Sequence, residues 1–224
     1  LVAGEPDDLD DLVTDAVAAR TAVLSLADLA GPATLTPPPD PPPPDPLPGV
    51  ALRMLTSGTT GPPSRVDLTY ETLHRVMEGA KHYESNARTD ARLRSGVMVV
   101  NSPMVHLGGL FRILQAVGDG RRFVLLERFQ VEPWIDAVRR HRPATVSLVP
   151  AALRMVYDAD LDPADLASVR SVVSGTAPLD PALAEAFTER YGVPVLTSYA
   201  ATEFGGGVAG WNLRDHERYA AEKR

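Results

Sequence analysis

The sequence of 224 residues contains no cysteine, and this absence alone excludes several classes of site. Without thiols there is no disulfide scaffold, no iron–sulfur cluster, no zinc–thiolate centre and no cysteine nucleophile. Lysine and arginine number 22 against 29 acidic residues, so the net charge of −7 offers no basic footprint for nucleic acid. No apolar run reaches the roughly 18 residues that a membrane-spanning helix needs.

A secretory signal is also missing from the beginning of the chain. Acidic residues stand where a basic region is expected, namely Glu5, Asp7, Asp8, Asp10 and Asp11. The content of 44% hydrophobic and 23% charged residues is close to that of an average globular protein. These features predict a soluble protein of the cytoplasm. Because the chain begins at Leu1 rather than at methionine, we expect it to be a piece of a longer protein.

Proline is the residue in excess, and many of the 21 prolines lie between residues 37 and 48. Such a run favours polyproline II and cannot join a helix or a central strand. Residues 37–48 are therefore predicted to be a stiff linker, with an SH3-type ligand as the alternative. The linker separates a partial N-terminal segment of helix and strand, residues 1–36, from a partial domain over residues 49–224. Apolar residues at helical spacing predict a helix within residues 9–30.

From residue 50 onward, short apolar runs alternate with amphipathic stretches. We expect strands over residues 50–55, 96–100, 122–126, 144–149, 169–173 and 193–196. We expect helices over residues 70–83, 108–117, 133–141, 151–157 and 181–191. The alternation predicts an α/β domain with a layered, largely parallel sheet and flanking helices. Ligand sites in such folds form in the loops beyond the carboxyl ends of strands.

The loop after the first of these strands is rich in hydroxyl groups and glycine: Thr56, Ser57, Gly58, Thr59, Thr60 and Gly61. Its two glycines allow a tight turn, and its hydroxyl and backbone N–H groups are able to surround a polyanion. It is not the usual nucleotide-binding loop, because no lysine follows Gly61. The residues alone leave a phosphate-binding loop and an ordinary surface turn equally open.

The order of residues in this loop resembles the signature of the adenylate-forming superfamily, which includes acyl-CoA synthetases, luciferases and adenylation domains of peptide synthetases. The resemblance implies that the loop holds the β- and γ-phosphates of ATP. Ser64 stands where the family has lysine, and Arg65 stands where it has glycine. Arg65 is therefore the candidate cation for the phosphates, because arginine is a good phosphate partner.

Two further stretches resemble family motifs in the same order. Residues 102–109 contain His106, which by itself is an ordinary helix-entry residue bonded to backbone, and which the resemblance places beside the acyl pocket and the carboxylate. Residues 172–179 form a turn that by itself needs Gly175 for its backbone angles. The resemblance places this turn along the adenine, with the contacts made by Gly175, Thr176, Ala177 and Pro178. Thr176 replaces a family glycine.

The fourth stretch, residues 198–203, resembles the family's Tyr-Gly-x-Thr-Glu segment and by itself is an ordinary turn or helix start. The resemblance implies that Tyr199 stacks on adenine, with Ala200 standing at the glycine position. It further implies that the Thr202 hydroxyl contacts the α-phosphate and that Glu203 helps to hold Mg²⁺. A hard cation that bridges phosphate oxygens requires a carboxylate of this kind.

Taken together, the resemblance implies an incomplete N-terminal core of the adenylate-forming fold and the ATP-dependent activation of a small carboxylic acid, with coenzyme A as second substrate. The apolar stretch from His106 to Leu114 favours a hydrophobic acid. We expect the family's C-terminal lysine domain to be absent, and the chain to be weakly active or inactive. The alternative is a non-catalytic nucleotide-binding remnant or an interaction protein. The oligomeric state is not indicated.

Overall fold

The computed structural model describes residues 23–26, 33–36, 47–56, 64–81 and 93–219. The chain divides into two compact units, Leu1–Pro48 and Gly49–Arg224. In the first unit, strand β1 (Val23–Leu26) pairs antiparallel with strand β2 (Ala33–Thr36). The helix expected within residues 9–30 is therefore wrong at residues 23–26, which form strand β1. Pairing with β2 stabilises an extended backbone there, although the apolar spacing favours a helix. Residues 9–22 and 37–46 lie outside the described residues.

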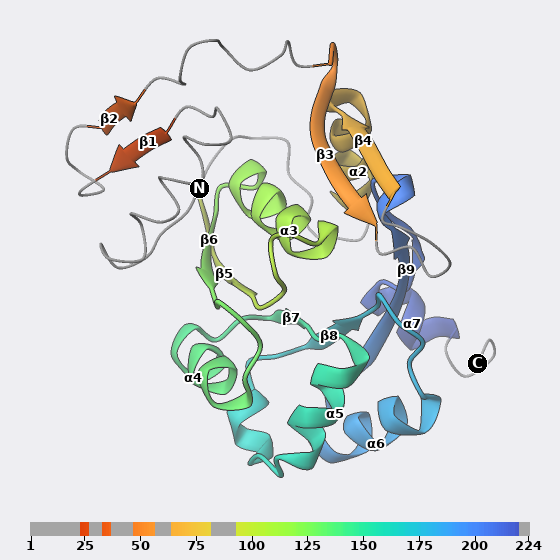
Figure 1. Ribbon diagram of the computed structural model, residues 1–224. Coiled ribbons are helices and arrows are strands. Elements are labelled where there is room, and N and C mark those ends of the chain that lie inside the picture. The colour runs from red at the N-terminus through yellow and green to blue at the C-terminus, as the bar shows by residue number, and fades with distance from the viewer. Residues whose placement is uncertain (1–22, 27–32, 37–46, 57–63, 82–92, 220–224) are drawn as a thin grey trace. The chain divides into compact units, whose positions relative to one another are not determined.

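The second unit is built on parallel strands. Strands β7 (Thr145–Ser147), β8 (Ser171–Ser174) and β9 (Val195–Ala201) run parallel, and β10 (Gly206–Gly210) adds to β9 in the antiparallel direction. Strands β5 (Arg94–Val100) and β6 (Arg121–Leu125) form a further parallel pair. The prediction of an α/β fold with parallel strands and flanking helices is confirmed (Figure 1).

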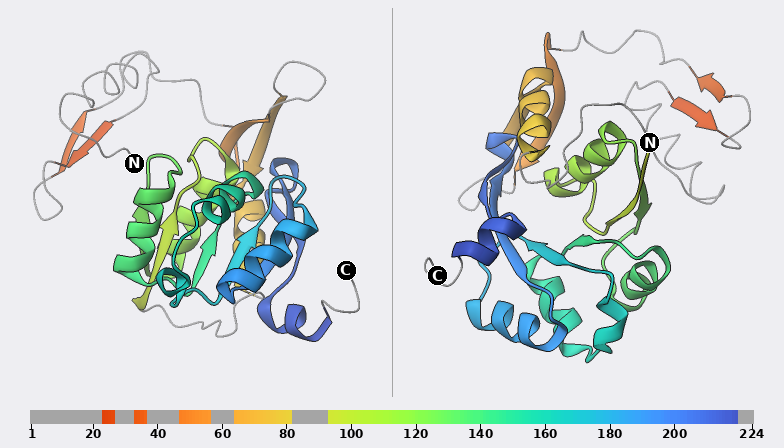
Figure 2. Two further views of the ribbon diagram at one scale, coloured as in Figure 1. Left: turned by 90° about the horizontal axis from the view of Figure 1, so that it is seen from below. Right: turned by 180° about the vertical axis from the view of Figure 1, so that it is seen from behind.

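Helices cover both sides of these strands. Helices α4 (Val131–His141), α5 (Pro150–Asp158) and α6 (Pro181–Tyr191) lie on one side, and α3 (Leu107–Gly118) lies on the other (Figures 1 and 2). The larger core forms where the first three helices meet the sheet. Its fully buried side chains include Trp134, Leu153 and Phe187, packed with Val146 and Val172 from the strands.

A β-hairpin and a helix form the remaining part of the second unit. Strand β3 (Val50–Thr56) pairs antiparallel with β4 (Ser64–Thr69), and helix α2 (Tyr70–Lys81) follows. The Thr69 hydroxyl accepts a hydrogen bond from the Thr72 N–H at 3.0 Å, which caps the start of α2. A smaller core joins this part to α3 through Met54, Leu68, Leu73 and Leu107.

Several short elements were not expected from the residues alone. They are the 3₁₀ helix η1 (Pro163–Leu166), strand β10 and helix α7 (Leu213–Tyr219), whereas the 3₁₀ helix η2 (Thr202–Phe204) lies where a turn or helix start was expected. The hydrophobic pattern also predicts no strand over residues 64–69, where the structure has β4. Among the described helices, none is both long enough and apolar enough to cross a lipid bilayer.

Candidate functional site

The turn that follows β8 and the neighbouring strand β9 line an open pocket of about 690 Å³. The pocket lies at the carboxyl end of β8, where an open α/β sheet places its ligands. Three of the predicted adenine-site residues line it, namely Ala177, Pro178 and Tyr199. The other lining residues are Ser174, Leu179, Thr197, Ser198, Ala209, Gly210, Trp211, Asp215 and Tyr219.

The end of strand β8 approaches strand β9 closely, which explains why glycine stands at position 175. A Cβ atom on Gly175 would lie 2.6 Å from Ser198 Oγ and 2.9 Å from the Ser198 carbonyl oxygen, too close for any side chain. The Ser198 hydroxyl donates to the Ser174 carbonyl oxygen at 3.4 Å across the same gap. The expectation that Gly175 serves the backbone angles of the turn is wrong, because the left-handed residue is Thr176, with φ of 71°.

Thr176 therefore stores backbone strain on the rim of the pocket. It is exposed, and a β-branched side chain in the left-handed region costs about 1–2 kcal/mol. We expect Thr176→Gly to raise the free energy of unfolding by about 1 kcal/mol, since the greater freedom of glycine in the unfolded chain offsets part of the gain. Urea denaturation measures this change.

Thr176→Ala is the control for that substitution. Alanine keeps a Cβ atom in the left-handed region, so we expect its free energy of unfolding to stay within about 0.5 kcal/mol of the parent. An equal gain from both substitutions would show that the hydroxyl or methyl group, and not the backbone angle, is the source of the strain.

The segment from Tyr199 to Glu203 ends strand β9 and turns into η2. Tyr199 is 62% exposed, and its ring lies 6.5 Å from that of Phe204. An exposed ring beside a pocket offers a flat apolar face to a base. Ala200 is exposed and pairs with Gly207 of β10. Thr202 and Glu203 begin η2, and the Glu203 carboxylate faces solvent.

The turn after η2 packs against α2. Gly205 has φ of 75°, and a Cβ atom there would lie 2.6 Å from Thr72 Cγ2 and 3.7 Å from Leu68 Cδ2. The segment that carries Thr202 and Glu203 is thereby joined to the β3–β4 hairpin, which precedes α2 in the chain.

That hairpin carries the predicted phosphate loop. Thr56 pairs with Ser64, and Leu55 pairs with Arg65, so Thr56 and Arg65 lie where the hairpin opens into the loop. Arg65 is exposed. The loop residues Ser57, Gly58, Thr59, Thr60 and Gly61 lie outside the described residues.

His106 is the N-cap residue of α3 and is exposed. Its backbone is extended, with φ of −102° and ψ of 143°, and its side chain makes no capping hydrogen bond. The backbone carbonyl oxygen of His106 accepts from the N–H groups of Gly109 and Leu110 at 3.1 Å and 3.2 Å. The expected position at a helix entry is confirmed, and the capping bond from its side chain to the backbone is absent.

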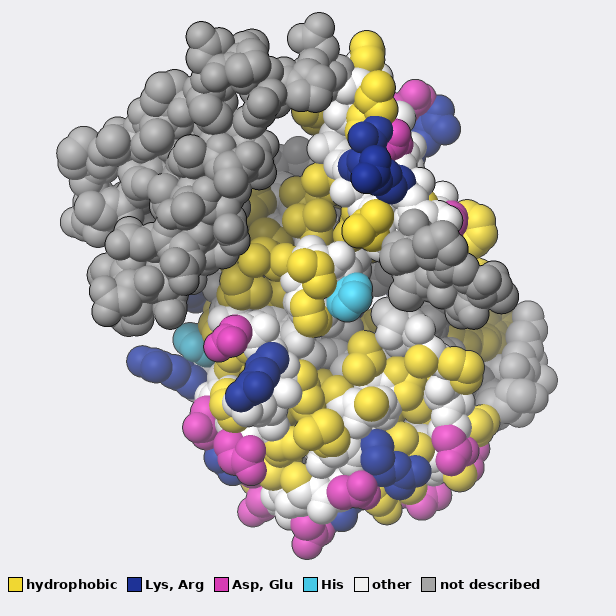
Figure 3. Space-filling model, in the orientation of Figure 1, with side chains coloured by type: hydrophobic (Ala, Val, Ile, Leu, Met, Phe, Trp, Pro, Cys, Tyr) yellow, Lys and Arg dark blue, Asp and Glu magenta, His cyan; other side chains and the backbone are white. Residues whose placement is uncertain are grey.

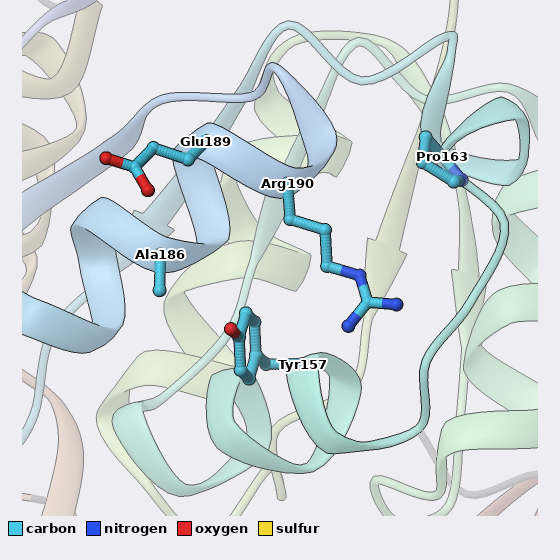
Figure 4. A pocket seen from close by; sticks show the side chains of 5 residues that line it. All are labelled: Tyr157, Pro163, Ala186, Glu189 and Arg190. Carbon is cyan, nitrogen blue, oxygen red and sulfur yellow. The ribbon is translucent and has the colours of Figure 1, made fainter.

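A second pocket, of about 570 Å³, lies away from all these residues between α5, η1 and α6 (Figure 4). In it the Arg190 guanidinium lies 5.6 Å from the centre of the Tyr157 ring and forms an ion pair with Asp160. None of the predicted site residues lines this pocket, and its one arginine already has an acidic partner. The candidate site is therefore the pocket at Tyr199.

Comparison with known proteins decides the family. Residues 3–222 match the sequence profile of the AMP-binding enzymes. The chain belongs to this family. It is 30% identical over 177 residues to 4-coumarate–CoA ligase-like 3 of Arabidopsis thaliana, across 76% of this chain and 31% of that protein. It is 32% identical over 161 residues to 2-succinylbenzoate–CoA ligase of Staphylococcus epidermidis, across 70% of this chain and 31% of that protein.

The fold agrees with that assignment. The structure of o-succinylbenzoate CoA synthetase from Bacillus subtilis in complex with ATP and magnesium ion superposes with a TM-score of 0.63 at 24% identity. The match covers 74% of this chain and 33% of that one. The chain thus spans about a third of the length of these AMP-binding relatives. The resemblance stated from the four motifs is confirmed.

Glu203 is the carboxylate that the resemblance assigns to Mg²⁺ in this AMP-binding chain. Across the described ranges, no group of three or more His, Asp or Glu side chains is close enough to hold a metal ion. Mg²⁺ takes one or two protein carboxylates and completes its octahedron with phosphate oxygens and water. Glu203 fits such a site only together with a nucleotide.

Sequence reasoning missed the pocket residues that come from α7 and from the segment before it, namely Trp211, Asp215 and Tyr219. A signal for this helix was present. The Asn212 side chain accepts from the Asp215 N–H and donates to the Asp215 carboxylate, both at 2.8 Å. A polar cap followed three residues later by an acidic residue is the pattern of a helix N-terminus.

Proposed function

We propose that the chain carries the nucleotide- and acid-binding part of an enzyme that activates a carboxylic acid with ATP. The observation that carries this proposal is the pocket that unites the Ala177–Pro178 turn with Tyr199 in a member of the AMP-binding family. In the proposed reaction, a carboxylate oxygen attacks the α-phosphorus in line, an acyl-adenylate forms and pyrophosphate leaves. The thiol of coenzyme A then attacks the acyl carbon, which forms the thioester and releases AMP.

In this proposal, different residues of the chain bind different parts of ATP. Tyr199 provides a ring face for adenine, and the Thr202 hydroxyl donates to the α-phosphate. Arg65, with the loop between β3 and β4, binds the β- and γ-phosphates. Mg²⁺ beside Glu203 neutralises phosphate charge when it is bound. The exposure of Tyr199, Glu203 and Arg65 supports these roles, because none of the three is committed to the core.

The acid lies on the side of His106 and α3 in this proposal. The apolar side chains near the start of α3 suit a small acid with hydrophobic character. Residues 49–224 then form a partial domain for ATP and the acid. Because the chain matches only about a third of its relatives, we expect slow or no acid activation by these 224 residues alone.

Titration of the chain with ATP and Mg²⁺ by calorimetry tests the proposal. Tyr199→Ala is expected to weaken ATP binding about tenfold, because stacking of a base on an aromatic ring contributes about 1–3 kcal/mol. Tyr70→Ala is the matched control, since Tyr70 is 70% exposed on α2 and lines no part of the pocket. Absence of ATP binding, or an equal loss in both variants, would contradict the proposal.

Three substitutions, at Ser64, Thr176 and Ala200, favour a second candidate function, a non-catalytic nucleotide-binding or interaction protein. Thr176 is strained at a position where the family has glycine, and Ala200 also replaces a family glycine. Pyrophosphate exchange that depends on an added acid supports the enzyme. ATP binding without such exchange supports the second candidate.

A further inference from the structure

An ion pair joins the two strands of the β3–β4 hairpin beside the predicted phosphate loop. The Arg53 guanidinium donates two hydrogen bonds to the Asp67 carboxylate, from Nε to Oδ1 at 2.6 Å and from Nη2 to Oδ2 at 3.0 Å. The two residues are direct partners in the antiparallel register. Their side chains are 45% and 36% exposed, so the pair adds little to stability, whereas its two parallel bonds fix the position of the carboxylate.

A second arginine lies on the same face of the hairpin. Arg65 and Asp67 are two residues apart on β4, so they share the face opposite to that of the buried Leu68. Their Cα atoms are about 7 Å apart along the strand, a distance that an arginine side chain spans. The hydrogen bonds from Arg53 lower the pKa of the Asp67 carboxyl below its ordinary value, and the charge of Arg65 lowers it further. Asp67 is thus within reach of either arginine.

In the structure Asp67 pairs with Arg53, and the Arg65 guanidinium stays open to solvent. Arg65 is exposed and forms no ion pair within the ranges that the structure describes. Its partner across the strands is Leu55, which carries no charge. Figure 3 shows basic and acidic side chains gathered over the part of the molecule that the β3–β4 hairpin and α2 form. Each oxygen of the Asp67 carboxylate already accepts a hydrogen bond, so Asp67 attracts a second cation less strongly.

We propose that Arg53 is a positioning residue, which holds the Asp67 carboxylate so that Arg65 stays available to the phosphates of ATP. This inference rests on the proposed function, in which Arg65 binds the β- and γ-phosphates. Without Arg53, the Asp67 carboxylate would pair with Arg65 and compete with the phosphates for its guanidinium. The family has glycine at position 65, so the need for this arrangement arises from the arginine of this chain.

A pH titration of the Asp67 carboxyl by NMR tests the exchange of partners without any ligand. In the parent chain and in Arg65→Met, Arg53 should hold the pKa of Asp67 below its ordinary value. In Arg53→Met the pKa should stay below that value, because Arg65 then binds the carboxylate. Removal of both arginines should bring the pKa up to its ordinary value. A return to the ordinary value in Arg53→Met alone would show that Arg65 does not pair with Asp67 and would overturn the inference.

Calorimetry with ATP and with AMP, each in the presence of Mg²⁺, tests the consequence for binding. We expect Arg53→Met to weaken ATP binding about two- to fivefold, which is the range that competition from an exposed ion pair gives. AMP binding should stay unchanged, because AMP lacks the phosphates that Arg65 binds. Arg65→Met should then cost less ATP affinity in the Arg53→Met background than in the parent. Equal losses in the two backgrounds would show that Arg53 acts through its charge alone and would overturn the inference.

Arg75→Met is the matched control, since Arg75 is also an exposed arginine and pairs with an acidic side chain, Glu71, on α2. This substitution should change neither the affinities for ATP and AMP nor the pKa of Asp67. If Arg53→Met fails to fold, Arg53→Gln replaces it under the same expectations. Absence of ATP binding by the parent chain would overturn the proposed function and this inference together. ATP binding that the loss of Arg53 leaves unchanged would overturn this inference alone.

Discussion

Gly109→Ala is expected to lower the free energy of unfolding of the second unit by about 3 kcal/mol or more. A Cβ atom at this position would lie 2.7 Å from the carbonyl carbon of Pro103 and would also overlap the carbonyl oxygens of Ser102 and Pro103. These atoms belong to the backbone, so no rotamer change relieves the overlap. Helix α3 would have to move away from the segment that leads into it. Urea denaturation followed by circular dichroism measures the loss.

The adjacent glycine provides the control. A Cβ atom on Gly108 would meet no atom within 4 Å, and Gly108 lies in the same first turn of α3. Because alanine is the better helix former, we expect Gly108→Ala to be neutral or to stabilise by up to about 1 kcal/mol. Equal destabilisation by both substitutions would show that the first turn of α3 does not tolerate any Cβ atom, and that the close approach of residues 102 and 103 is not the cause.

Gly205→Ala is expected to lower the free energy of unfolding by about 2–4 kcal/mol, the second-largest effect. Two costs add here. The left-handed φ of 75° disfavours any side chain, and the new methyl group would lie 2.6 Å from Thr72 Cγ2. Threonine is stiff at χ1, so this methyl group does not move aside easily. Because the turn also holds Thr202 and Glu203 against α2, ATP binding should weaken in the same variant.

Gly207→Ala is the matched control for that change. Gly207 lies two residues further on in β10, its φ is not positive, and a Cβ atom there would meet nothing within 4 Å. We expect its stability to stay within about 0.5 kcal/mol of the parent and its affinity for ATP to be unchanged. If Gly205→Ala left the free energy of unfolding and the affinity for ATP unchanged, the packing of the turn on α2 would contribute nothing to either.

Strong local signals made most of the second unit predictable from the residues. The helix over residues 181–191 was placed without error, because Pro181 fits a first helical turn. Its Asp180 cap accepts from the Ala182 N–H at 3.0 Å. Strand β10 lacked such a signal: its sequence is rich in glycine, which disfavours strands, and only pairing with β9 makes it extended.

The site was predictable where a motif fixes an element end, and unpredictable where tertiary packing decides. Tyr199 and Pro178 come together because parallel strands β8 and β9 end at one edge of the sheet. No local pattern shows that Gly175 faces Ser198, or that Gly205 packs against Thr72. Such facts depend on neighbours distant in sequence.

The β3–β4 hairpin forms its ladder of hydrogen bonds within itself, and no other strand of the described sheets joins it. The hairpin is attached to the rest of the unit by apolar side-chain contacts through residues such as Leu68 and Leu73. Contacts of that kind are non-directional, so they tolerate small sliding movements that a shared ladder would resist. A small shift of this hairpin therefore breaks no backbone hydrogen bond to another strand of the described sheets.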